Sequence, residues 1–315
     1  MFSTSIDEVL VRPRLSCPEA FQILGEMARK SRFTVTVSDK GRFTQETIFK
    51  FGSLSAVAEN LRAKPKRDVF LKFLDRSANM KGIFDNGVFL KDDRRYLDFK
   101  AIQKCGADEE IATALINEMV GLGIFKRGFL FQCEKCRQSD WYAISTVSNN
   151  FVCKRCGTEQ LYTERHWRHP KEEPRFFYML DEIVYQALVN GCAVTIFALD
   201  ELRGRSKNSF LFTSEVELKS GSSKSSIEID LTAVVDGTFM LGEAKKEGRL
   251  GGDTTEEEKN IRKYGSLAEA LSAERLLFAT IDEKWADTTV ERAERLLKDH
   301  DVECEFVARD VLGYL

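Results

Sequence analysis

The sequence predicts an α/β protein whose C-terminal half is an α/β/α sandwich with a mixed central sheet. Two observations support this fold class. Helix and strand patterns follow one another from residue 176 onward in the order helix, strands, helix, strand, helix, strand. Within this half, Asp236-Gly237 separates two β-type runs, and this dipeptide favours a two-residue hairpin turn. Four cysteines in two CxxC pairs precede the sandwich and predict a separate small module.

The elements of the C-terminal half follow from apolar periodicity and from turn residues. We expect a helix over 176–189 that ends at Asn190-Gly191, where glycine supplies the turn. The remaining expected elements are strands at 193–199, 210–219, 227–235 and 238–244, a helix at 255–272, a strand at 276–281, a helix at 289–299 and a strand at 302–307.

Residues 1–130 predict an α+β region, with helices at 18–30 and 53–61 and a strand at 32–38. From residue 96 the order helix, turn, helix, β-hairpin resembles a winged-helix unit. We therefore expect three units: 1–130, the cysteine module at 131–162, and the sandwich at 175–315.

The composition is that of an ordinary globular protein. The 315 residues are 43% hydrophobic and carry a formal net charge of −3, so the chain can form cores and can carry only local basic patches. We find no apolar stretch long enough to cross a membrane and no secretory signal, and we expect a cytoplasmic protein. Outside the CxxC pairs, four cysteines are expected to be free thiols: Cys17, Cys105, Cys192 and Cys304.

The cysteine module predicts a zinc ribbon. Cys133 and Cys136 form one CxxC pair, Cys153 and Cys156 form the other, and sixteen residues separate the pairs, which suits a hairpin. Gly157 supplies the positive φ that such a turn needs. Four thiolates fill the tetrahedral coordination of Zn²⁺, so this zinc is expected to be structural. Unpaired or redox-active dithiols are the alternative.

Cations and aromatic residues surround the cysteines. Cations beside aromatic rings suit phosphate contact and base stacking, so these residues are candidates for nucleic-acid contact. The candidates are Lys135, Arg137, Trp141, Lys154 and Arg155. In the alternative interpretation Trp141 packs the core of the ribbon and the cations are simply solvated. The sequence leaves both interpretations open.

The sharpest chemical pattern lies in the predicted hairpin. Asp230 is on its first strand, and Glu243 and Lys245 are two residues apart on its second strand, so these two side chains share a face. Pairing around the turn brings Asp230 close to them. Two carboxylates and a few waters suit Mg²⁺ or Mn²⁺, and a neighbouring ammonium can orient a water nucleophile.

These residues resemble the PD-(D/E)xK nuclease superfamily, which includes restriction-endonuclease-like and Mrr-like domains. The resemblance covers about 175–310 and implies a catalytic set of Asp230, Glu243, Lys245 and Glu182, with the metal on Asp230 and Glu243. Asn260 and Tyr264 match a Gln-x-x-x-Tyr element as accessory residues, although asparagine replaces the usual glutamine. Ile229 stands where the family has proline.

The resemblance implies a Mg²⁺- or Mn²⁺-dependent deoxyribonuclease that hydrolyses phosphodiester bonds, with DNA as its partner. It also implies a role in anti-phage defence or DNA processing, as a homodimer or with a partner subunit. The alternative is an inactive nuclease fold that binds nucleic acid or another protein through the zinc ribbon.

Overall fold

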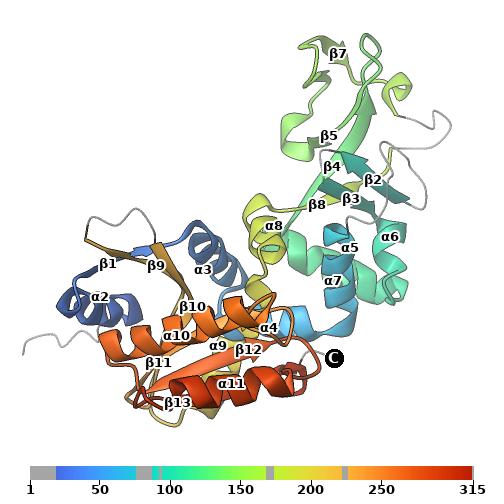
Figure 1. Ribbon diagram of the computed structural model, residues 1–315. Coiled ribbons are helices and arrows are strands. Elements are labelled where there is room, and N and C mark those ends of the chain that lie inside the picture. The colour runs from blue at the N-terminus through green and yellow to red at the C-terminus, as the bar shows by residue number, and fades with distance from the viewer. Residues whose placement is uncertain (1–18, 76–86, 92–93, 168–173, 222–225, 314–315) are drawn as a thin grey trace, which may run out of the picture.

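The computed structural model describes residues 19–75, 87–91, 94–167, 174–221 and 226–313. They form a mixed α/β protein with two lobes (Figure 1). One lobe, which we call the sandwich lobe after its predicted fold, contains a six-stranded sheet and its helices, whereas the arm contains a five-stranded sheet that ends in the cysteine module.

The sheet of the sandwich lobe is mixed, as the sequence predicts. Its strands lie in the order β1-β9-β10-β11-β12-β13, antiparallel from β1 to β11 and parallel from β11 to β13. The strands are β1 (Phe33–Val37), β9 (Phe210–Ser220), β10 (Ser226–Val235), β11 (Thr238–Lys245), β12 (Arg275–Thr280) and β13 (Glu303–Val307). The predicted strands at 210–219, 227–235, 238–244, 276–281 and 302–307 are confirmed within a few residues.

Helices cover both faces of this sheet and enclose a separate apolar cluster on each (Figure 1). One face carries α2 (Ala20–Lys30), α10 (Thr254–Leu271) and α11 (Asp287–Leu297). The other face carries α9 (Cys192–Arg205), which contacts β9 to β12. Beside α9, and also in contact with β9, lies α3 (Asp39–Phe51). The other helices that contact α9 are α4 (Leu54–Arg62), α8 (Glu182–Val189) and the short α12 (Arg309–Leu312).

The predicted strand at 193–199 is wrong, because these residues belong to helix α9. Most of the helix is buried, between the sheet on one side and α4 and α8 on the other. A helix that is buried all round has no polar face and therefore no amphipathic period, so its run of Val, Thr, Ile and Phe imitates a buried strand. The preceding helix α8 is also shorter than predicted, because residues 177–180 form strand β8.

Residues 19–37 belong to the sandwich lobe. Strand β1 pairs with β9, from Phe33 opposite Ser220 to Val37 opposite Val216, and α2 packs beside α10. A boundary at residue 130 would separate β1 from the strand it pairs with. The sequence does not show this pairing, because the two strands are more than 170 residues apart.

The arm is built around a sheet in the order β2-β3-β8-β4-β5. Its elements are β2 (Val88–Lys91), β3 (Arg94–Asp98), β4 (Phe125–Gln132), β5 (Ser139–Ala143), β8 (Phe177–Leu180), α5 (Lys64–Leu74), α6 (Phe99–Gln103) and α7 (Glu109–Gly121). A hairpin of β6 (Asn150–Val152) and β7 (Glu159–Leu161) lies at its end. In the described residues no single helix is long and apolar enough to cross a membrane; α8 and α9 pass that test only as a pair bent by 85°.

Candidate active site and metal centre

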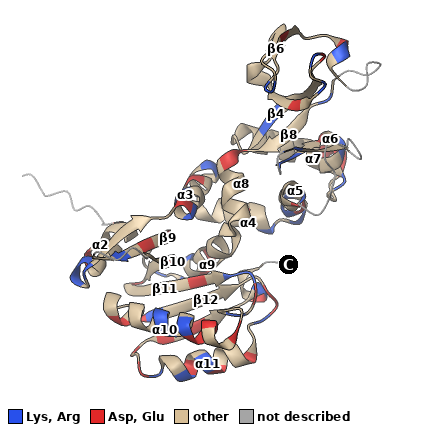
Figure 2. Ribbon diagram, turned by 45° about the horizontal axis from the view of Figure 1, so that its top comes forward, with Lys and Arg blue, Asp and Glu red and all other residues tan. Residues whose placement is uncertain are grey.

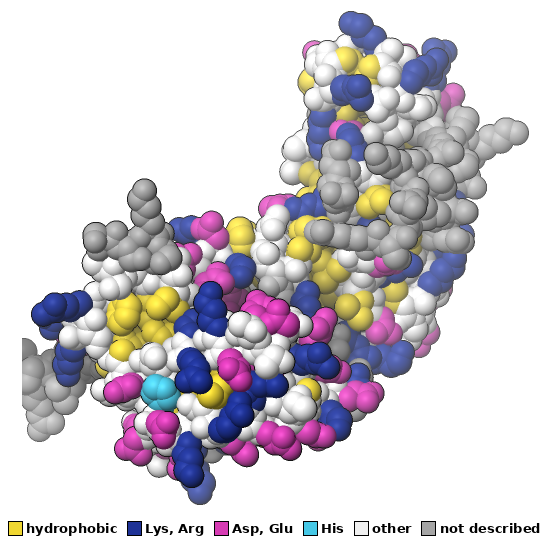
Figure 3. Space-filling model, viewed as in Figure 1, with side chains coloured by type: hydrophobic (Ala, Val, Ile, Leu, Met, Phe, Trp, Pro, Cys, Tyr) yellow, Lys and Arg dark blue, Asp and Glu magenta, His cyan; other side chains and the backbone are white. Residues whose placement is uncertain are grey.

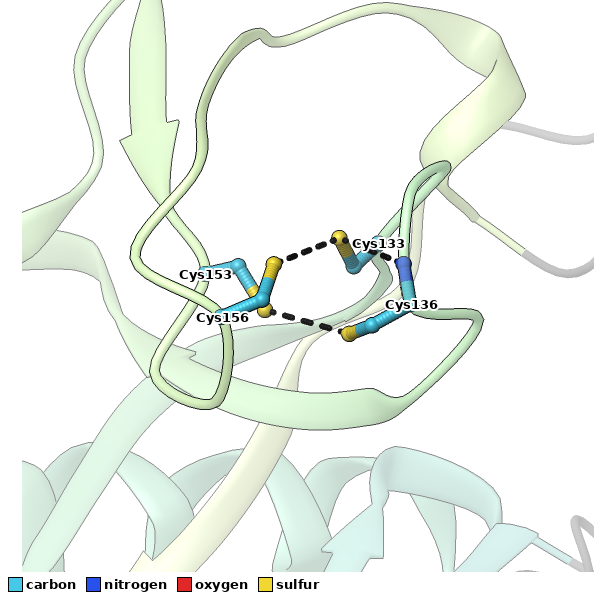
Figure 4. A group of neighbouring side chains, drawn as sticks. All are labelled: Cys133, Cys136, Cys153 and Cys156. Atoms are coloured by element: carbon cyan, nitrogen blue, oxygen red, sulfur yellow. Dashed lines mark hydrogen bonds between the residues drawn. The ribbon is translucent and has the colours of Figure 1, made fainter.

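Four cysteine thiols face one another at the end of the arm (Figure 4). The sulfur atoms of Cys133 and Cys156 are 3.6 Å apart, as are those of Cys136 and Cys153. All four lie within 4.8 Å of one another. Four thiolates at about 2.3 Å from a zinc ion form a tetrahedron with edges of about 3.8 Å. The cluster could therefore bind a metal such as zinc, with no coordination position left for a substrate.

Each CxxC pair adopts the same turn. The amide of Arg137 donates a hydrogen bond to the carbonyl of Cys133, and the amide of Gly157 donates to that of Cys153, both at 2.9 Å. Arg137 and Gly157 both have a positive φ, of 58° and 68°. The side-chain amide of Gln160 also donates to the sulfur of Cys133, at 3.1 Å. The ligands are therefore positioned by the backbone and by a neighbouring amide.

Trp141 does not fit the predicted contact with nucleic acid. Only 4% of it is exposed, its indole nitrogen donates to the carbonyl of Phe177 at 3.0 Å, and its ring stacks on Tyr96. The ring therefore packs the arm. The ammonium of Lys154 donates to the Trp141 carbonyl at 2.5 Å and so also stabilises the module. The other predicted contacts are exposed cations of the cysteine module, Lys135, Arg137 and Arg155. Figure 2 shows Lys and Arg positions in the ribbon at the end of the arm.

Strands β10 and β11 form the predicted hairpin. Both residues of its turn, Asp236-Gly237, have a positive φ, as this type of turn requires. The pairing ends at Leu231 opposite Gly242. One residue beyond, the carboxylate of Asp230 accepts a hydrogen bond of 2.8 Å from the amide of Ala244. Asp230 is therefore held against β11 where the regular ladder stops.

Glu243 and Lys245 share one face of β11, as predicted. The ammonium of Lys245 lies 2.5 Å from one carboxylate oxygen of Glu243. The other oxygen accepts a hydrogen bond from the hydroxyl of Tyr264, which is fully buried on α10. The predicted accessory residue Tyr264 therefore contacts the predicted acidic residue directly.

A further carboxylate, Glu215 on β9, was not predicted. Glu215 has a positive φ of 23°, and the ladder passes over it between the pairs Val216–Ile229 and Ser214–Leu231. Val216 and Ile229 pack into the apolar cluster under α10, whereas Leu231 packs into the cluster on the opposite face. At this point the alternation of side chains in both strands therefore shifts, so that positions of the same parity face opposite sides of the sheet before and after it. Glu215 lies at the shift and is only 4% exposed.

The carboxyl groups of the site disfavour one another's ionisation. Burial, together with the neighbouring charge of Asp230, raises the pKa of Glu215 to about 8. Burial and the charge of Glu243 raise the pKa of Asp230 to about 7. Burial opposes the charge of Lys245, but the carboxylate of Glu243 still raises its pKa. One oxygen of Glu215 is buried and has no hydrogen-bond partner.

Two predicted residues lie away from this group. The carboxylate of Glu182 pairs with Arg94 on β3 and accepts a hydrogen bond from Gln186, so it faces the arm. The amide of Asn260 donates to the carbonyl of Leu250 at 2.6 Å and holds the loop after β11. Glu182 therefore lies apart from Asp230 and Glu243: it is on α8, whereas the helix that packs on strands β9 to β12 is α9.

The acidic group, by which we mean Glu215, Asp230 and Glu243, is less suited to hold an ion as it stands than the cysteine cluster is. Within the described ranges, the four cysteines are the only group of three or more histidine, cysteine or acidic side chains placed so that they could hold a metal ion. Both carboxylate oxygens of Glu243 are engaged, one by Lys245 and the other by Tyr264, so a cation at Asp230 and Glu243 would require the ammonium of Lys245 to leave its ion pair. The face seen in Figure 3 is hollowed between the two lobes, and acidic and basic side chains border the hollow.

No known protein family and no curated protein matches this chain. Among solved structures, the chain is similar to protein VC1899 from Vibrio cholerae, with a TM-score of 0.37, 13% identity and 92% of this chain covered. It is also similar to Can2 from Sulfobacillus thermosulfidooxidans, determined in complex with cyclic tetra-adenylate, with a TM-score of 0.32, 10% identity and 90% covered. The chain spans 58% and 56% of the length of these two proteins.

Proposed function

We propose that this chain is a Mg²⁺-dependent deoxyribonuclease of the PD-(D/E)xK type that hydrolyses phosphodiester bonds at Asp230, Glu243 and Lys245. The observation that carries the proposal is the convergence of Glu215, Asp230 and Glu243 from three adjacent strands, with one buried carboxylate oxygen left without a partner. Buried polar groups are nearly always hydrogen-bonded, so an orphaned oxygen among several carboxyl groups suggests a ligand that is a cation.

The donor set fits a hard divalent cation. Mg²⁺ prefers oxygen ligands and takes one or two carboxylates from protein, with water and phosphate completing its coordination. Asp230 and Glu243 would supply those carboxylates, and Glu215 would lie next to them. The raised pKa values of Asp230 and Glu215 support this fit, because a bound cation would favour the ionised form of both groups.

The chain's own residues have distinct tasks in this proposal. A divalent cation supplies Lewis-acid polarisation of a phosphoryl oxygen and a lowered pKa of bound water. Asp230 is oriented by the amide of Ala244, and Glu243 is oriented by the hydroxyl of Tyr264. Once released from Glu243, Lys245 holds the attacking water or balances the charge that develops on the phosphate.

The ribbon has a supporting role in the proposal. A zinc ion on the four cysteines would fold the end of the arm, and exposed cations at that end would contact the DNA backbone. These cations are Lys135, Arg137 and Arg155. We place this nuclease in the cytoplasm, in anti-phage defence or DNA processing, as a homodimer or with a partner subunit.

The experiment is cleavage of linear, circular and single-stranded DNA with Mg²⁺ or Mn²⁺. Asp230→Asn, Glu243→Gln and Lys245→Met should each lower the rate by at least about 100-fold, because each removes a group that acts on the scissile phosphate. Glu182→Gln is the matched control and should keep the wild-type rate, since Glu182 pairs with Arg94. Cleavage by all three variants at the wild-type rate would reject the proposal.

A further inference from the structure

Helix α3 begins directly at the acidic group. The amide of Ser38 donates to the carbonyl of Glu215 at 3.1 Å, and the hydroxyl of Ser38 caps the helix by accepting from the amide of Gly41 at 2.9 Å. A Cβ atom on Gly41 would lie 2.1 Å from the same Glu215 carbonyl. Only glycine allows this approach, so the first turn of α3 lies on the backbone of β9 at its change of face.

This first turn carries Lys40. Its ammonium lies 3.3 Å and 3.4 Å from the two carboxylate oxygens of Glu228 on β10. The charges of Glu215 and Asp230 also act on it. Lys40 is therefore a second ammonium group beside the acidic residues, contributed by a segment about 200 residues away from Lys245 in the sequence.

Helix α3 is held at both ends by contacts with neighbouring elements, whereas the side chain of Lys40 is accessible to solvent. At the C-terminal end of α3, Lys50 lies 3.6 Å from Asp181, and Phe51 packs against Phe70 of α5. The side chain of Lys40 is 41% exposed and that of Glu228 is 46% exposed. A rigid backbone with a solvent-accessible charged end is the arrangement that positions a binding group.

We propose that Lys40 binds a non-bridging phosphate oxygen of the nucleic acid next to the scissile bond, and that it leaves Glu228 to do so. The proposal rests on the proposed function and adds a substrate contact to it. An ion pair this exposed contributes little to stability, so a phosphate can displace the Glu228 carboxylate at small cost. Lysine binds phosphate as a point charge and does not need the planar geometry of an arginine contact.

The test measures binding and cleavage separately. Fluorescence anisotropy of a short DNA duplex is recorded with Ca²⁺ in place of Mg²⁺, from about 50 to 200 mM salt, a range over which phosphate contacts weaken measurably. Lys40→Ala should weaken binding about tenfold and lower the slope of log affinity against log salt by about one. Lys40→Arg should keep the slope. Lys66→Ala is the matched control, because Lys66 pairs with Glu118 on the arm, and it should behave as wild type.

The outcomes separate this inference from the proposed function. The expected result is that Lys40→Ala also lowers kcat/KM with Mg²⁺ about tenfold, mainly through KM, and that Lys40→Arg restores it. If the wild type binds DNA with the Lys40-dependent slope but does not cleave it, the phosphate contact of Lys40 stands, whereas its place beside a scissile bond fails together with the nuclease proposal. If the wild type cleaves DNA and Lys40→Ala matches it in slope and KM, the inference is refuted. Absence of DNA binding by the wild type overturns both.

Discussion

Glu215→Gln should stabilise the metal-free protein at alkaline pH. The side chain of Glu215 is 4% exposed, and one of its oxygens has no hydrogen-bond partner. Its ionised form is disfavoured by burial and by the charge of Asp230. Glutamine has nearly the same shape and carries no charge, so the substitution removes the unfavourable charge and keeps the packing.

The magnitude follows from the raised pKa. A carboxyl whose pKa is higher in the folded state than in the unfolded state makes its full contribution to the free energy of unfolding below its ordinary pKa of 4.5. That contribution falls as the pH rises and is lost once the pH passes about 8. The free energy of unfolding changes by about 1.4 kcal/mol for each unit between the two pKa values, so the wild type loses roughly 5 kcal/mol between pH 4 and pH 9 through this group. Glu215→Gln has no such loss.

The assay is urea unfolding of both proteins at pH 5, 7 and 9 in buffer without divalent cations. The variant should gain little at pH 5 and several kcal/mol at pH 9. Glu217→Gln, two residues along the same strand and partly exposed, is the control and should not show this pH-dependent gain. Equal stability of wild type and Glu215→Gln at pH 9 would refute the reasoning, because it would mean that the carboxylate is already solvated or paired.

Three further predictions follow from single contacts. Tyr264→Phe removes the hydroxyl that donates to Glu243 and should lower the Mg²⁺-dependent cleavage rate about tenfold without unfolding the protein; an unchanged rate would exclude a role for this hydrogen bond. Cys153→Ser should lose the bound zinc, as metal analysis would show, and make the end of the arm sensitive to protease while the sandwich lobe stays folded; retained zinc would contradict the four-thiolate site. Gly41→Ala should lower stability to urea by about 1–3 kcal/mol, because its Cβ would meet the Glu215 carbonyl; unchanged stability would show that α3 can move.

Much of the sandwich could be predicted because its signals are local. The positive φ values of Asp236 and Gly237 and the pairing of β10 with β11 follow from the dipeptide and its flanking runs. The cysteine spacing likewise predicts the cluster. Helix α9 could not be predicted in the same way, because burial on all sides removes the periodicity that distinguishes a helix from a strand.

The rest of the site depends on long-range contacts. In a regular strand Glu215 would share a face with Glu217 and Lys219, which are more exposed, so the sequence alone indicates a solvated side chain. It is buried because β9 changes face at that residue. Lys40 lies beside the site because β1, which precedes it, pairs with β9. Glu182 lies away from the site because α8 faces the arm. None of these contacts leaves a local signal in the sequence.

The central claim is that a divalent cation binds between Asp230 and Glu243. Anomalous diffraction from crystals soaked in Mn²⁺ tests it most directly, because the ion is located by its own scattering. We expect one strong peak within about 2.3 Å of a carboxylate oxygen from each residue, with Lys245 moved away from Glu243. A map with no peak there, and with Lys245 still paired to Glu243, would contradict the claim.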